Sequence, residues 1–236
     1  LAKKRQRLLM LSLPGRIGAV TLRAREIVQQ GLLGKLFAVN ILQVKDQTRL
    51  TRKSYHKSWF AFRNRAGGGH LIWLGIHQMD QVFFITGDRV RRVSAFCRNV
   101  GGQPVEIEDT ESVSMEFKSG MLGTFHGGYF LAGGMETGIS IWGTKGWLKI
   151  ESHRGPQGTA RKFQWYSTHP QARRGVQNET PTSKVSGYQG MVQSSIHAAR
   201  GAAAAPLTAE DSLEVLRVIF SAYKASDSGK VQVIRR

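Results

Sequence analysis

The chain has 236 residues, of which 41% are hydrophobic and 21% are charged, and it carries a formal net charge of +18. This composition is ordinary for a globular protein, and no apolar run reaches the roughly 18 residues that a membrane-spanning helix needs. Cys97 is the only cysteine, which excludes an internal disulfide. We expect a cytoplasmic protein with no membrane association.

The positive charge is concentrated in the first 65 residues. They contain 15 lysines and arginines against two acids, Glu26 and Asp46, so +13 of the net charge lies there. Such a balance fits nucleic acid, an anionic substrate or cofactor phosphate, or a surface that meets an acidic partner. The sequence has no helix-turn-helix signature, zinc-finger spacing or RNP-like aromatic motif, so we do not expect specific binding of nucleic acid.

The first part of the chain predicts a strand, a helix, a strand, a loop and a helix. In that order they cover residues 8–13, 19–33, 35–46, 47–66 and 70–86. The first helix has apolar residues at helical spacing and ends at Gly31 and Gly34, and the second strand alternates apolar and polar residues. The loop is polar and aromatic without a clear period, and we expect it to cover a functional site.

The remainder of the chain predicts a sheet and two closing helices. Strand-like runs cover residues 89–100, 110–120, 121–130, 137–146, 147–152, 162–167 and 230–234, and the helices cover 187–200 and 208–226. Thr208, with Asp211 three residues later, has the pattern of a capping box. The expected fold class is α/β (α+β), with an open, mostly antiparallel sheet and helices on one face.

Four residues interrupt the apolar pattern of the helix over 70–86. His70, Trp73, His77 and Asp80 have the spacing i, i+3, i+7 and i+10, which places them within one quadrant of an α-helix. They could be satisfied core polar groups, or His77 could be an acid/base residue in a pocket. In a third interpretation, His70, His77 and Asp80 hold a metal ion. No second cluster supplies a fourth ligand, so we expect no metal.

Several segments, in the same order along the chain, resemble one protein family. The stretch "AGGGHLIWLGIHQMDQVFFITG" resembles the signature of the Gfo/Idh/MocA oxidoreductases, the glucose-fructose oxidoreductase and inositol dehydrogenase group. Its glycine triplet, aliphatic pair, glycine, histidine and later aspartate carry this resemblance. Other segments that resemble the family are "AREIVQQGLLGKLFAV", "EIEDTESVSMEFKSGMLGTFHGG", "IWGTKGWLKIE" and "IHAARGAAAAPLTAEDSLEVLRVIFSAYKASDSGKVQVI". Together they span nearly the whole chain.

The resemblance implies a domain organisation. Family members have an N-terminal Rossmann domain that binds NAD or NADP, followed by an α/β domain whose open sheet commonly forms dimers or tetramers. We therefore interpret residues 1–34 as the last strand, helices and linker of a truncated Rossmann domain. Residues 35–236 are the expected substrate and oligomerisation domain, which implies a homo-oligomer through the sheet face. The glycine-rich phosphate turn and the family's Glu-Lys-Pro segment are not found in this sequence.

The resemblance also implies site residues. The family's acid/base histidine falls on His77, and the family aspartate four residues earlier falls on Trp73, which cannot titrate. Asp80 matches the later aspartate of the signature, for which we expect a structural role. Arg16 is the expected cofactor-binding residue. The expected substrate-binding residues are His56, Arg63, Asn64 and Trp73, the last as a flat wall against a sugar face.

The predicted function is that of an NAD(P)-dependent oxidoreductase acting on a sugar or polyol hydroxyl. Hydride would pass to or from the nicotinamide while His77 transfers the proton. The alternative is a non-enzymatic sugar-binding or oligomerisation module, or a pseudoenzyme, because the aspartate, the lysine and the glycine fingerprint of the family are not found here. Without the phosphate cradle, this chain alone is not expected to bind a dinucleotide tightly.

Overall fold

The computed structural model describes residues 1–156, 158–183, 185 and 187–235. Most of the strands are eight to eleven residues long. Their bounds are β1 (Leu36–Asp46), β2 (Val90–Arg98), β3 (Thr110–Phe117), β4 (Leu122–Leu131), β5 (Met135–Gly143), β6 (Gly146–Gly155), β7 (Gly158–Ser167), β8 (Gln177–Glu179) and β9 (Gln232–Val233).

These strands form one sheet with the order β8-β7-β6-β5-β1-β4-β3-β2-β9. The pair β1 and β4 is parallel, and the other neighbouring pairs are antiparallel. The open, mostly antiparallel sheet confirms the predicted fold class. The order places the N-terminal strand β1 in the middle of the sheet, between two strands from later in the chain.

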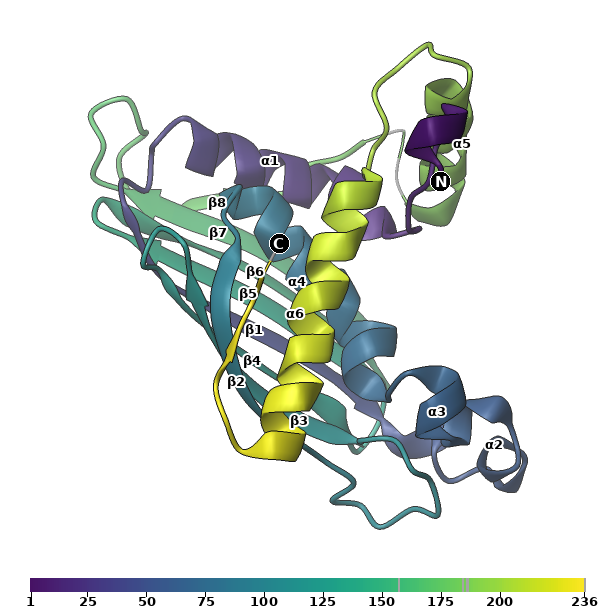
Figure 1. Cartoon of the computed structure of the whole chain (residues 1–236). Coiled ribbons are helices and arrows are strands. Elements are labelled where there is room, and N and C mark those ends of the chain that lie inside the picture. Colours follow the sequence, from purple (N-terminus) through teal and green to yellow (C-terminus); the bar gives the residue numbers. More distant parts are fainter. Residues whose placement is uncertain (157, 184, 186, 236) are drawn as a thin grey trace.

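The helices differ in length and in position. Their bounds are α1 (Ala19–Gln29), α2 (Lys53–His56), α3 (Arg63–Ala66), α4 (Ile76–Thr86), α5 (Gly187–Ala199) and α6 (Ala209–Ser228). Shorter turns are η1 (Lys3–Arg5), η2 (Pro14–Ile17), η3 (Gln47–Arg49), η4 (Trp59–Ala61) and the π-helical turn η5 (Leu71–Gly75). Figure 1 shows α1, α4 and α6 across one face of the sheet, with α2 and α3 beyond the ends of the central strands and α5 beside the N-terminus.

The core lies between the sheet and these helices. Alternate side chains of the central strands, such as Val39, Ile41 and Phe125, are almost fully buried and join one cluster with Met79 of α4 and Ile219 of α6. This alternation follows from the period of two in a strand, which sends successive side chains to opposite faces. Helix α6 begins at the predicted capping box, in which Thr208 and Asp211 satisfy each other's backbone N–H groups.

The opposite face of the sheet is not covered by a helix. It carries Phe96, Leu122, Phe130 and Trp142, whose side chains are 71%, 60%, 42% and 36% exposed. Residues paired across neighbouring strands point to the same face of the sheet. Leu122 and Trp142 both pair with Ala38. Phe96 pairs with Ser112, which pairs with His126 on the strand of Leu122. An apolar surface of this kind is uncommon on a monomer.

Two expectations about local structure were wrong. Residues 8–13 do not form a strand, because no described segment pairs with them, and Leu8 and Leu9 are exposed. A strand needs a neighbour for its N–H and C=O groups, which periodicity alone does not supply. The predicted loop over residues 47–66 contains the short helical turns η3, α2, η4 and α3. In the described part of the chain, no helix is both long and apolar enough to cross a bilayer.

Candidate active site

The segment with the glycine triplet begins a continuous helix made of η5 and α4. Its first turn is π-helical, with the Ile76 N–H bonded to the Leu71 carbonyl five residues earlier. Such turns occur frequently at functional sites, and they rotate side chains away from the α-helical phase. The structure therefore corrects the single quadrant predicted for His70, Trp73, His77 and Asp80, since these residues contact different parts of the molecule.

Trp73 lies in the π-helical turn and contacts the segment between β1 and the glycine triplet. Its ring packs edge-on against Trp59 at 5.5 Å and Phe60 at 5.0 Å between ring centroids. Trp59 is 45% exposed, so this aromatic cluster reaches the surface. The indole N–H of Trp73 is buried and has no hydrogen-bond partner among the described residues. The arrangement offers an aromatic wall but no carboxylate.

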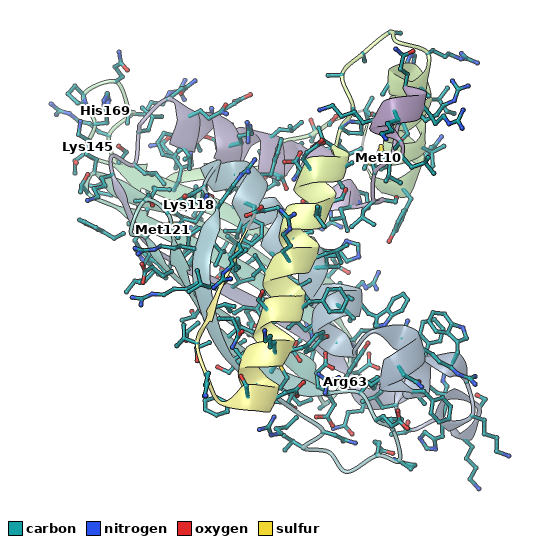
Figure 2. All side chains as sticks on the ribbon, in the orientation of Figure 1. Met10, Arg63, Lys118, Met121, Lys145 and His169 are labelled. Atoms are coloured by element: carbon teal, nitrogen blue, oxygen red, sulfur yellow. The ribbon has the colours of Figure 1, made fainter. Side chains whose placement is uncertain are left out.

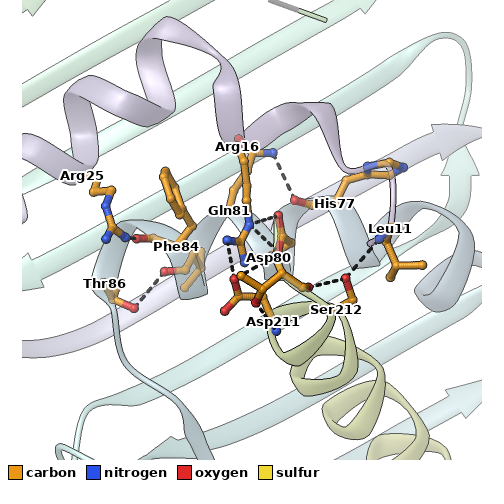
Figure 3. Close-up of polar contacts among 12 residues, drawn as sticks. Leu11, Arg16, Arg25, His77, Asp80, Gln81, Phe84, Thr86, Asp211 and Ser212 are labelled. Atoms are coloured by element: carbon orange, nitrogen blue, oxygen red, sulfur yellow. Dashed lines mark hydrogen bonds and ion pairs between the residues drawn. The ribbon is translucent and has the colours of Figure 1, made fainter. Parts of the chain in front are cut away.

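His77 follows Trp73 by four residues on the same helix. Its carbonyl accepts a hydrogen bond from the Gln81 side chain, while its imidazole makes no hydrogen bond within the described residues. The side chain is partly buried, and this burial lowers the pKa of His77 below its usual value. Figure 3 shows the ring directed away from Arg16 and Asp80. The lowered pKa favours the neutral imidazole near neutral pH, and no described residue bonds to this ring.

Asp80 and Arg16 form a buried ion pair near the middle of this helix. The Arg16 guanidinium lies 2.8 to 2.9 Å from the Asp80 carboxylate oxygens and 3.2 Å from Asp211 on α6 (Figure 3). It also stacks on Phe84, with its central carbon 5.0 Å from the ring centroid. These contacts give Asp80 a structural partner and occupy the guanidinium of Arg16. The assignment of Arg16 to cofactor binding stays a prediction.

His70 is fully buried at the start of the helix. Its Nδ1 lies 2.5 Å from Oε1 of Glu111 on β3, and neither side chain has any exposed surface. Its Nε2 and the second Glu111 oxygen are buried without a partner among the described residues. Because His70 bonds to Glu111 and Asp80 to Arg16, the structure does not join His70, His77 and Asp80 in a metal site, and no such cluster occurs among the described residues.

Of the three remaining substrate-binding candidates, Arg63 and Asn64 line one cavity, and His56 does not. The Nε2 of His56 is 2.6 Å from the carbonyl of Leu50, a contact that holds its own loop. Arg63 pairs with Asp227 at 2.7 Å and lies over the ring of Tyr223 on α6. With Asn64, it lines a surface cavity of about 750 Å³ beside the end of α6. Figure 2 shows Arg63 beside α3, at this lower end of α6. All three assignments stay predictions.

Sequence reasoning missed the acids and the tyrosine that hold the start of the helix. Glu108 accepts hydrogen bonds from the backbone N–H groups of Gly69 and Leu71 and from the hydroxyl of Tyr223. Burial and the nearby Glu111 carboxylate raise the pKa of Glu108 to about 7. The sequence signal was a local concentration of acids in a basic chain, Glu106, Glu108, Asp109 and Glu111, at the start of a predicted strand.

Comparisons with known proteins agree on one family. Residues 21–149 match the model of the GFO/IDH/MocA C-terminal domain. The curated 1,5-anhydro-D-fructose reductase of Ensifer adhaerens is 25% identical over 124 residues, which cover 52% of this chain and 35% of that protein. The matched segment is thus about a third of the curated relative.

Solved structures share the fold at low sequence identity. An oxidoreductase domain protein from Kribbella flavida superposes with a TM-score of 0.81 and 22% identity, over 100% of this chain and 68% of that one. The aldose-aldose oxidoreductase from Caulobacter crescentus, solved with glycerol, gives 0.77 and 22%, over 98% and 65%. The WlbA dehydrogenase from Bordetella pertussis, solved with NADH and UDP-GlcNAcA, gives 0.77 and 16%, over 100% and 66%.

Proposed function

Because the chain belongs to the GFO/IDH/MocA family, we propose that it forms the substrate-side domain of an NAD(P)-dependent oxidoreductase acting on a sugar or polyol hydroxyl. The names of similar proteins support this class of reaction: a sugar reductase, an aldose oxidoreductase and a dehydrogenase solved with NADH and a nucleotide sugar. The chain spans about two thirds of the solved relatives, so the activity of the whole protein is part of the proposal.

The state of His77 is the observation that carries this proposal. A proton acceptor must be neutral at the working pH and must have a free nitrogen for the substrate. The imidazole of His77 meets both requirements, since burial lowers its pKa and no described residue bonds to its ring. It would take the proton of the reacting hydroxyl during oxidation and return it during reduction. Trp73, one turn earlier, would pack against the apolar face of the sugar.

The described residues do not form a phosphate cradle for a dinucleotide. A phosphate cradle needs a strand, a glycine-rich turn and a helix N-terminus in succession. The glycines nearest this pattern, Gly127 and Gly128, lie inside β4 and are followed by β5, and the guanidinium of Arg16 is held by Asp80 and Asp211. We therefore assign no phosphate cradle to the described residues, and the cofactor contact of Arg16 stays a prediction. The proposal requires the nucleotide site to come from polypeptide other than these residues.

The test is made on the protein as its organism produces it, with NAD(P) and candidate sugars. Replacing His77 by alanine should lower kcat by about 100-fold or more, as expected for loss of a general base. Wild-type turnover in His77→Ala would refute the role of His77. In parallel, NADH and NADPH are titrated onto the 236-residue chain by fluorescence. A micromolar dissociation constant would contradict the statement that these residues lack a cofactor site.

A second candidate function is a non-enzymatic sugar-binding module or pseudoenzyme. The observation in its favour is Trp73, which leaves His77 without a carboxylate partner among the described residues. A sugar that quenches the fluorescence of this chain, together with no turnover by the protein from its organism, would favour the module. Turnover that depends on His77 would exclude it.

We also propose that the uncovered sheet face joins copies of the chain. Phe96, Leu122, Phe130 and Trp142 give this face exposed apolar side chains, and small polar residues such as Ser94 and Ser112 lie between them. Light scattering after size exclusion should report a dimer or a larger oligomer. Phe96→Glu should shift it toward the monomer, because burying an unpaired carboxylate in an interface is costly. A wild-type monomer would refute this part.

A further inference from the structure

Two side chains satisfy the first backbone N–H groups of the helix that carries Trp73 and His77. The first N–H groups of any helix lack partners within that helix. Here Glu108 accepts from the N–H of Gly69 at 2.7 Å through Oε2 and from the N–H of Leu71 at 3.1 Å through Oε1. The Glu108 backbone carbonyl accepts from the N–H of His70 at 3.3 Å. One residue, 39 positions after Gly69, therefore serves three successive donors.

Tyr223 completes this set from the long helix α6. Its hydroxyl donates to Oε1 of Glu108 at 2.7 Å and accepts from the N–H of Ile72 at 3.3 Å. The four successive N–H groups of residues 69–72 are thus held by two residues, and both side chains are at least 93% buried. A buried network in which every donor has a partner fixes the orientation of its members strongly. We call Glu108 and Tyr223 the helix clamp.

The glycine triplet permits this close approach. A Cβ atom on Gly69 would lie 2.0 Å from the carbonyl oxygen of Glu108, and one on Gly68 would lie 2.2 Å from the hydroxyl of Tyr223. Gly68 also has a φ of 155°, within the region that favours glycine. Glycine at positions 68 and 69 therefore permits the clamp to reach the backbone.

We infer that Glu108 and Tyr223 are positioning residues for the candidate active site, fixing the first turn of η5 and through it Trp73 and His77. The Trp73 N–H bonds to the carbonyl of Gly69, inside the clamped turn, and His77 follows one turn later. Neither clamp residue is placed in contact with a substrate. The inference rests on the proposed function only where it gives His77 a role in the site. The clamp itself stands on the hydrogen bonds.

The first measurement is amide hydrogen exchange of the whole chain by NMR. Tyr223→Phe keeps the ring and removes only the hydroxyl, and it should speed exchange of the residue 69–72 amides by about tenfold, with little change in the sheet. Tyr188→Phe is the matched control, because Tyr188 is 64% exposed on α5.

The second measurement asks whether the clamp positions the site. In Tyr223→Phe, the ring resonances of Trp73 and the titration midpoint of His77 should shift, although Tyr223 is placed in contact with neither. Faster exchange at residues 69–72 with both signals unchanged would overturn the positioning role. Unchanged or uniformly faster exchange would overturn the clamp. These readouts need no substrate, so an inactive protein would refute the proposed function while leaving this inference standing.

Discussion

The start and the middle of the helix η5–α4 are held by different chemistry. At the start, Glu108 and Tyr223 hold backbone N–H groups through buried hydrogen bonds. In the middle, on α4, the Asp80 side chain is held by the Arg16 guanidinium. The first arrangement is sensitive to one proton, and the second is sensitive to the loss of one charge. His77 lies between these two contacts and no described residue bonds to its ring, so the helix is held on both sides of its candidate catalytic group.

The largest effect is expected when the ion pair between Asp80 and Arg16 is removed. Asp80→Ala leaves the guanidinium of Arg16 buried with only the partly exposed Asp211, and it should lower the free energy of unfolding by about 4 kcal/mol. Asp227→Ala is the control, because it removes half of the exposed Arg63–Asp227 pair and should cost less than about 1 kcal/mol. Urea denaturation measures both. Equal losses in the two variants would contradict the difference in burial.

The next largest effect is the pH dependence of the free energy of unfolding that Glu108 contributes at the start of the helix. The folded state raises the pKa of Glu108 from 4.5 to about 7, so between these values the folded chain binds the proton more strongly than the unfolded chain does. Its contribution to stability is complete below pH 4.5 and is lost as the pH rises to 7, by about 3 kcal/mol at most.

Comparison with Glu108→Gln isolates this contribution. Urea denaturation across this pH range should give a steeper decline for the wild type than for the variant, which cannot titrate at residue 108. The variant is expected to have a lower free energy of unfolding at every pH. Its amide NH₂ group is a donor, and in either orientation it faces another donor, the N–H of Gly69 or the two groups that bond to Oε1. Parallel curves for the two proteins would show that Glu108 does not titrate in this range.

The smallest effect concerns the imidazole of His77, which lies between the Glu108 and Asp80 contacts of this helix. Burial lowers the pKa of His77, so its contribution has the opposite sign: stability is lost as the pH falls below the usual histidine value of 6.5. An NMR titration should give a midpoint for His77 below 6.5 in the folded chain and a higher one in the chain unfolded by urea. A folded midpoint above 6.5 would indicate a carboxylate partner and remove the argument for a neutral base.

Local pattern was sufficient for most of the secondary structure. Strand-like runs of apolar and polar residues in the sequence predicted β1 to β7 within a few residues. The capping box at Thr208 was confirmed together with helix α6. These features depend on neighbours within about four residues, which the sequence displays directly. Where the partner of an element was not local, as for residues 8–13, the same reasoning predicted a strand that the structure does not contain.

The candidate site divides in the same way. The glycine triplet, the helix and the position of His77 on it could be predicted from the sequence, because spacing and resemblance are properties of consecutive residues. The contacts of these residues could not, and they became known from the folded structure. Tyr223 lies 115 positions from Glu108, and Arg16 lies 64 from Asp80, yet each pair is in direct contact. A hydrogen bond depends on a distance of about 3 Å in space, and no periodicity along the chain reports that distance.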